Sequence, residues 1–206
     1  MKKLLKVICL SLLLFSFTSL ACAQDEIRIG VLFPLTGPLA STGQGLLEGA
    51  KLAADIVNTK NNLNMPLAKT AGLPNLKGAK IKIIPGDHQG KPEIGMAEAE
   101  RLITQEKVVA IIGCYNSAVT ATASQAAERY GIPFLNDSST SPSLTERNFK
   151  WFFRTTPNDD LLSENFFHFL NDLKKKKKIT VGPIALLYEN TLFGSDSRKF
   201  QEKYAQ

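Results

Sequence analysis

The feature that most constrains this chain is a regular alternation of short apolar runs with segments of helical periodicity. The apolar runs predict strands at residues 27–33, 80–84, 108–112 and 131–135. Apolar residues at helical spacing lie between them, at 45–57, 92–106 and 117–130. The run at 108–112 has no polar interruption, which is typical of a strand buried on both faces. This order predicts an α/β fold: a parallel sheet with helices on both faces.

Three loops follow predicted strands, at residues 34–43, 113–117 and 136–141. They are rich in hydroxyl side chains, small residues and free backbone N–H groups. In open parallel sheets, ligands bind beyond the carboxyl ends of the strands. The three loops are therefore expected to converge on one crevice.

The chain changes character after the fourth predicted strand. Residues 151–157 are aromatic and extended, as expected of a segment that crosses between two bodies. A helix is predicted at 161–173, a strand at 184–188 and a further helix at 196–204. One strand and one more helix cannot bury a second core. We therefore expect two lobes, the second incomplete, divided into a first lobe at 24–150, a crossing at 151–160 and a second-lobe start at 161–206.

Residues 1–23 have the pattern of a secretory signal, with early lysines followed by 14 apolar residues at 7–20. Ala21-Cys22-Ala23 predicts cleavage after Ala23. The alternative is a lipoprotein signal with lipid on Cys22, although Ser19 stands where an aliphatic residue is usual. Both alternatives predict a periplasmic or other extracytoplasmic protein, either secreted or lipid-anchored. No other apolar run is long enough to span a bilayer.

The charge balance does not indicate a nucleic-acid partner. The 25 Lys and Arg against 19 Asp and Glu give a net charge of +6, but three lysines lie in the predicted signal and five in the run 174–178. That run is expected to end a helix in solvent, where it complements the helix dipole. After cleavage Cys114 is the remaining cysteine, so we expect a small buried residue and no internal disulfide.

Catalytic and cofactor motifs are weak or missing. Gly43 and Gly45, with Gly49 after them, resemble a dinucleotide fingerprint, but about nine residues separate them from the strand they should follow. We expect these glycines to let a first helical turn pack closely. The pair Asp87 and His88 is expected to be a solvated loop feature. No cofactor, metal or enzymatic activity is predicted.

The crevice residues suit a small zwitterion. Ser117, at a predicted helix start, offers a hydroxyl and neighbouring amides, where the helix dipole favours a carboxylate. Ser139 and Thr140 add donors from a facing loop. An ammonium group needs an acid, and Asp137 is the one acid evident in these loops, so its partner is expected from the second lobe.

Several segments, in this order and spacing, resemble periplasmic binding proteins of the leucine/isoleucine/valine type, which have the type I periplasmic-binding-protein fold. They are residues 29–40, 111–113, 116–117, 131–133, 139–145 and 153–155. The resemblance implies a substrate-binding component of an ABC importer, whose two lobes close on an amino acid, such as a branched-chain one, or a related amide. It implies membrane permease subunits as partners and no enzymatic activity.

The resemblance also implies roles for single residues. Ser117, Ser139 and Thr140 match positions that grip the α-carboxylate and α-ammonium groups of the ligand. Four further positions are expected in or near the pocket: Tyr115, Asn116, Thr42, where relatives often have an aromatic residue, and Phe193, which matches an aromatic residue of the second lobe. The family's acid for the ammonium comes from later in the second lobe, beyond this chain.

Three other interpretations remain open from the sequence. The same fold serves as a ligand-binding sensory domain. A chain with part of one lobe missing is expected to bind weakly or not at all, and would then be a truncated receptor without function. An α/β enzyme such as a dehydrogenase lacks its glycine turn here.

Overall fold

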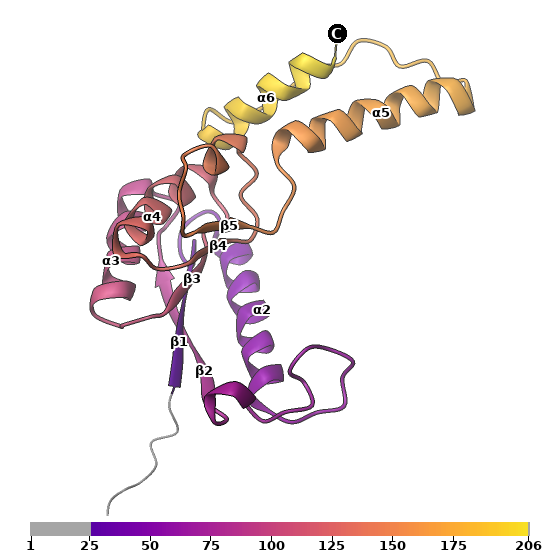
Figure 1. The fold of residues 1–206 in the computed structure, drawn as a ribbon. Coiled ribbons are helices and arrows are strands. Elements are labelled where there is room, and N and C mark those ends of the chain that lie inside the picture. Colours follow the sequence, from indigo (N-terminus) through magenta and orange to yellow (C-terminus); the bar gives the residue numbers. More distant parts are fainter. Residues whose placement is uncertain (1–25, 206) are drawn as a thin grey trace, which may run out of the picture.

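The computed structural model describes residues 26–205 (Figure 1). The predicted signal segment, with Ala23 and Cys22, lies outside the described residues. The strands are β1 (Glu26–Phe33), β2 (Lys80–Asp87), β3 (Ala110–Gly113), β4 (Phe134–Asn136) and β5 (Phe152–Arg154). The α-helices are α2 (Ala40–Asn58), α3 (Pro92–Thr104), α4 (Ser117–Tyr130), α5 (Asp159–Lys177) and α6 (Leu192–Tyr204). Two short 3₁₀ turns, η1 (Pro74–Leu76) and η2 (Pro142–Thr145), complete the elements.

The five strands form one parallel sheet in the order β2-β1-β3-β4-β5. Helix α2 lies on one side of the sheet, whereas α3 and α4 lie together on the other (Figure 1). The predicted parallel sheet with helices on both faces is therefore confirmed. All strands point the same way, so their carboxyl ends and the loops that follow them share one edge.

The core has two layers because successive side chains of β1 point to opposite faces. Leu32 packs with Leu102, Ile111 and Phe134 in the larger layer, beneath α3 and α4. Val31 belongs to the smaller layer, beneath α2. Both faces of β1 are buried at Val31–Phe33, which is why the end of this strand is an uninterrupted apolar run.

Helix α2 begins earlier than its periodicity indicated, at Ala40 rather than Gly45. At Gly43 the helix crosses the backbone of Pro34 so closely that a Cβ atom would lie 2.1 Å from the Pro34 carbonyl oxygen. At Gly45 and Gly49 a Cβ would meet nothing within 4 Å. The expectation that a small residue lets the first turn pack closely is confirmed for Gly43.

The expectation that Asp87 and His88 are solvated is wrong for His88, which is fully buried. Burial raises the pKa of Asp87, but hydrogen bonds outweigh this effect and the pKa is lowered. Its carboxylate accepts from the backbone amides of Leu35 and Thr36, at 2.9 and 3.3 Å, and from that of Gln89 at 3.0 Å. Asp87 at the end of β2 thus fixes the loop after β1, because the ends of these paired parallel strands lie side by side.

The predicted crossing segment also contributes the edge strand β5, which pairs with β4. The rings of Phe134 and Phe152 stack with centroids 5.9 Å apart. The Arg147 guanidinium lies over the Phe152 ring at 5.1 Å. The sheet of the first lobe therefore continues to Arg154, past the predicted end of that lobe at residue 150.

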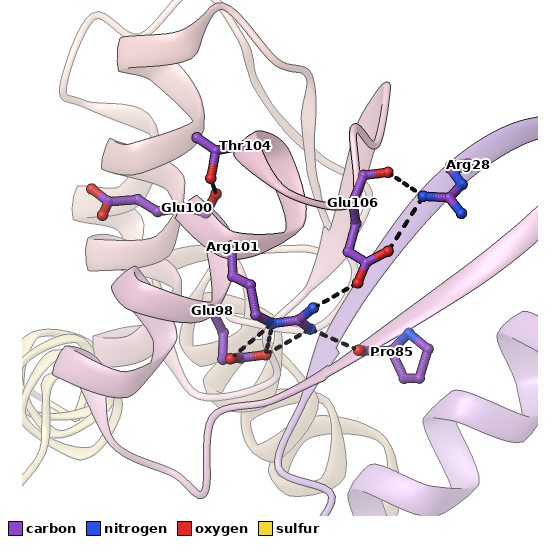
Figure 2. Close-up of polar contacts among 7 residues, drawn as sticks. All are labelled: Arg28, Pro85, Glu98, Glu100, Arg101, Thr104 and Glu106. Atoms are coloured by element: carbon purple, nitrogen blue, oxygen red, sulfur yellow. Dashed lines mark hydrogen bonds and ion pairs between the residues drawn. The ribbon is translucent and has the colours of Figure 1, made fainter.

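At the amino ends of the strands, β1 is tied to α3 by ion pairs (Figure 2). Arg101 pairs with Glu98 at 3.0 Å and with Glu106 at 3.1 Å. Glu106 also pairs with Arg28 at 3.3 Å. The contact with Glu98 is the main reason why the pKa of Arg101 is raised. This network lies at the edge of the sheet away from the predicted crevice.

Beyond the sheet, α5 extends away from the body (Figure 1). Helix α6 begins beside the body and packs against α5. Asn158 caps α5 by accepting a hydrogen bond from the Leu161 amide at 2.9 Å. Lysines 174–177 form its last turn, as predicted, and Lys178 ends it in a left-handed conformation. The capped helix begins two residues before the predicted start at 161.

The predicted strand at 184–188 is wrong. Residues 178–189 have no regular secondary structure, and Leu187 is fully exposed. A strand needs a hydrogen-bonded neighbour, and none of the described residues pairs with this segment. The segment thus has the apolar pattern of a strand, but its backbone has no hydrogen-bonded neighbouring strand among the described residues.

Candidate ligand-binding site

A cavity of about 600 Å³ lies at the carboxyl ends of the strands. Its walls come from the first-lobe loops on one side and from α5 and α6 on the other. Of the seven residues predicted for ligand binding, five line it: Tyr115, Asn116, Ser117, Thr140 and Phe193. Ser139 and Thr42 are not among the lining residues. Leu39, from the loop after β1, lines the cavity as well. The predicted convergence of the three loops is therefore confirmed.

The amino end of α4 forms one wall. Asn116 is its N-cap, but the Asn116 side chain does not cap the helix. The first amides of a helix have no intrahelical acceptor, so this end is suited to an anion. Asn116 Oδ1 is buried without a hydrogen-bond partner among the described residues, and the nearby Ser117 is almost fully buried.

Ser139 shapes this wall rather than facing the cavity. Its hydroxyl donates to the Tyr115 carbonyl at 2.9 Å and lies 2.7 Å from the Thr120 hydroxyl. Thr120 in turn accepts from the Cys114 amide at 3.2 Å. The Ser139 proton is thus already engaged. Cys114 is fully buried, as expected from the sequence.

Thr140 and Ser138 face the cavity from the loop after β4. The hydroxyl oxygens of both are buried without a hydrogen-bond partner among the described residues. The Thr140 carbonyl accepts from the Asp159 amide at 2.9 Å, which joins this loop to the start of α5. Ser138 was not singled out from the sequence, where it looked like one of several equivalent hydroxyl residues.

Asp159 is an acid at the cavity that the sequence analysis did not identify. It lies in the first turn of α5, lines the cavity and is only 3% exposed. Burial raises its pKa and the charge of Asp196 adds to the rise, whereas the Thr140 hydroxyl and the charge of Arg154 oppose it. Asp159 Oδ2 lies near that hydroxyl but has no hydrogen bond of good geometry among the described residues.

The start of a helix after Pro157 was the signal that could have identified Asp159, since acids favour a first helical turn. The acid expected from later in the second lobe stays a prediction, but a buried carboxylate already lines the cavity. Asp137, the acid considered from the sequence, does not line the cavity.

The opposite wall is largely apolar. Phe193, at the start of α6, faces the cavity together with Leu162 and Phe166 of α5. Helix α6 is held against the first lobe by a contact of 2.5 Å between Ser141 Oγ and Asp196 Oδ2. Thr42 is exposed on α2, so its predicted place beside the ligand stays a prediction.

No group of three or more His, Cys, Asp or Glu in the part of the chain that the structure describes could hold a metal ion. Within residues 26–205, no helix combines the length and apolar character needed to cross a membrane.

The sequence pattern of one protein family, described as periplasmic binding protein, matches residues 26–206. The chain belongs to this family. It is 32% identical over 181 residues to an "Amino acid binding protein" of Pseudomonas aeruginosa, covering 87% of this chain and 45% of that protein. It is 26% identical over 194 residues to "Leu/Ile/Val-binding protein homolog 7" of Brucella abortus, covering 89% and 43%. The chain thus spans less than half the length of these relatives.

Solved structures of this family have the same fold. The branched-chain amino acid transporter substrate-binding protein LivJ of Streptococcus pneumoniae, in complex with isoleucine, is 27% identical with a TM-score of 0.62. The match covers 75% of this chain and 39% of LivJ. An ABC transporter substrate-binding protein of Desulfitobacterium hafniense, 23% identical, gives a TM-score of 0.66 and covers 88% and 47%. The predicted family and fold class are confirmed.

Proposed function

We propose that this chain carries the main ligand-binding wall of an extracytoplasmic solute-binding protein, which captures an amino acid for an ABC importer. The observation that carries the proposal is a set of buried polar atoms around one cavity without partners among the described residues. They are Asn116 Oδ1, Thr140 Oγ1 and Asp159 Oδ2. Buried polar groups usually have hydrogen-bond partners, so a polar ligand would satisfy them.

The ligand's carboxylate is assigned to the amino end of α4. The uncapped amides there, together with the Ser117 and Thr140 hydroxyls, supply donors without any lysine or arginine. Charge–dipole attraction at a helix terminus contributes about 0.3–1 kcal/mol, and up to about 2 kcal/mol in a partly buried site. Each hydrogen bond to the charged group adds to this.

The ligand's ammonium group is assigned to Asp159. A buried carboxylate is stabilised when a cation pairs with it, and an α-ammonium beside a bound carboxylate offers that cation. Leu162, Phe166 and Phe193 would then cover an apolar ligand side chain. A branched-chain or aromatic amino acid fits this division into a polar and an apolar wall.

Transport is supported by the relatives, whose names include amino acid binding and Leu/Ile/Val-binding proteins. In this role the receptor delivers its ligand to permease subunits in the membrane. The predicted signal at 1–23 supports export, with either cleavage after Ala23 or lipid on Cys22. The intact mass of the exported protein distinguishes these two forms.

Nuclear magnetic resonance titration of the full chain tests the ligand class. We expect leucine or phenylalanine to shift the amide signals of Ser117, Ala118 and Thr140. Urea tests the amide alternative, and 4-hydroxybenzoate tests a carboxylate that lacks an ammonium group. If no amino acid shifts these signals, the proposal is wrong.

Variants then separate the two ends of the ligand. Asp159→Asn removes the charge but keeps the shape, so we expect amino-acid affinity to fall about 10- to 100-fold. Binding of a plain carboxylate should not fall. Thr104→Ala is the control, because that hydroxyl bonds to the Glu100 carbonyl on the surface of α3 (Figure 2). Equal affinity of Asp159→Asn and the unmodified chain would contradict the assignment of Asp159.

A further inference from the structure

The imidazole of His88 connects two loops that line the cavity. The Gly90 amide donates to His88 Nδ1 at 3.0 Å, so Nδ1 is the acceptor and the ring proton lies on Nε2. His88 Nε2–H then donates to the Cys114 carbonyl at 2.9 Å. Gly90 lines the cavity, and Cys114 directly precedes the lining residues Tyr115 and Asn116.

We propose that neutral His88 is a positioning residue for the ligand, holding the Gly90 loop and the Cys114 loop in their binding arrangement. The inference rests on the proposed function of this cavity. Neutral imidazole has one acceptor nitrogen and one N–H, which match the Gly90 amide and the Cys114 carbonyl. Imidazolium has two N–H groups, so protonation places a donor against the Gly90 amide and breaks that contact.

Burial favours the neutral form of the ring. Burial lowers the pKa of His88 from its ordinary value of 6.5 and outweighs the hydrogen bond to the Cys114 carbonyl and the charge of Asp87, which both raise it. The thiol of Cys114 brings no charge, because burial raises its pKa well above the usual value and the charge of Asp137 adds to the rise. From helix α3, the uncharged residue Gly95 lies beside the Cβ atom of His88.

The resulting pH dependence has a definite sign. The folded pKa of His88 is below its unfolded value, so the unfolded chain takes up the proton first as the pH falls. The stability contributed by neutral His88 is present above pH 6.5 and is lost as the pH falls through that value toward the folded pKa. Ligand affinity falls when the folded ring itself is protonated, at a lower pH.

The first test needs no ligand. Nitrogen-15 spectra of the full chain should show His88 as the Nε2–H tautomer at neutral pH. Hydrogen exchange of the Gly90 amide should become about tenfold faster in His88→Met, which keeps an apolar volume but loses the acceptor. The Nδ1–H tautomer in the unmodified chain, or unchanged Gly90 exchange in a folded His88→Met, would overturn the proposal.

The second test is the pH profile of amino-acid affinity. His88→Gln keeps an N–H group for the Cys114 carbonyl and does not titrate. We expect its affinity at neutral pH to stay within about tenfold of the unmodified chain and its loss of affinity in acid to disappear. His168→Gln is the matched control, because His168 is the other histidine of the chain and is exposed on α5. It should keep the acid loss.

The two proposals fail separately. An acid loss that persists in His88→Gln overturns the role of His88 and leaves the ligand site intact. Absence of amino-acid binding in the unmodified chain overturns the proposed function, while the tautomer and the Gly90 exchange still decide whether His88 holds the two loops.

Discussion

The first lobe and the segment after it use similar apolar patterns with different results. In the first lobe, Leu32, Leu102 and Phe134 are completely buried, because sheet and helices cover one another. After residue 158, Phe169 is 56% exposed and Leu187 is fully exposed. The difference shows that an apolar pattern specifies what a segment can bury, whereas burial itself depends on which neighbours the chain provides.

The cavity lies where these two regions meet. Donors for a carboxylate come from α4 and the loop after β4, which the sheet holds in place. The acid, Asp159, comes from the first turn of α5, and Phe193 comes from α6. The well-packed region thus carries one end of the proposed ligand, and the more exposed region carries the other.

The largest expected effect tests the difference in packing. Phe134→Ala should lower the free energy of unfolding by about 3–5 kcal/mol, because it empties a buried site against Phe152. Phe169→Ala, the matched change on the exposed helix, should change it by less than about 0.5 kcal/mol. Urea unfolding measures both. Equal losses would mean that α5 is as well packed as the sheet.

A smaller effect tests whether α5 can loosen by itself. Asn158→Ala removes the N-cap of α5 and should destabilise that helix by about 1 kcal/mol. Hydrogen exchange should accelerate in α5 and stay unchanged in β1 and β3. The control is Asn171→Ala, since Asn171 is exposed on the same helix. Faster exchange throughout the sheet would instead join the two regions into one cooperative unit.

The smallest effect concerns the acid between the regions. The pKa of Asp159 is raised by burial, so the folded state holds its proton more tightly than the unfolded state. Stability is therefore lost as the pH rises from the ordinary pKa of 3.8 through the raised one. Asp159→Asn should raise the melting temperature at neutral pH and leave it nearly unchanged below pH 3.8. A lower melting temperature at neutral pH would contradict the cost assigned to this buried charge.

The sequence predicted those parts of the fold that depend on local periodicity. β1, α3 and α4 lie close to their predicted bounds, because the burial of each follows from its own apolar spacing. The prediction of a strand at 184–188 is wrong because a strand needs a hydrogen-bonded neighbour. The residues of the segment itself do not indicate whether such a neighbour is present. The edge strand β5 was expected to be extended, but its pairing with β4 could not be read from residues 151–157.

The sequence predicted most of the residues that line the cavity, but it did not distinguish the contacts of individual hydroxyl groups. Ser117 and Thr140 line the cavity, whereas the hydroxyl of Ser139 is engaged by Tyr115 and Thr120. No local pattern distinguishes Ser139 from its neighbour Ser138, which does face the cavity. His88 was misjudged for the same reason, since its burial depends on the loop that contains Cys114.

The hydrogen-bonded series from the Cys114 amide through Thr120 and Ser139 to the Tyr115 carbonyl has one permitted direction. An amide nitrogen can only give a proton and a carbonyl oxygen can only receive one, so each hydroxyl between them must receive from one side and give to the other. Two rotors that could point many ways in water thus share a single orientation in the fold. The conformation of the loop from Cys114 to Tyr115 therefore depends on the order of hydrogen-bond donors and acceptors as well as on side-chain volume.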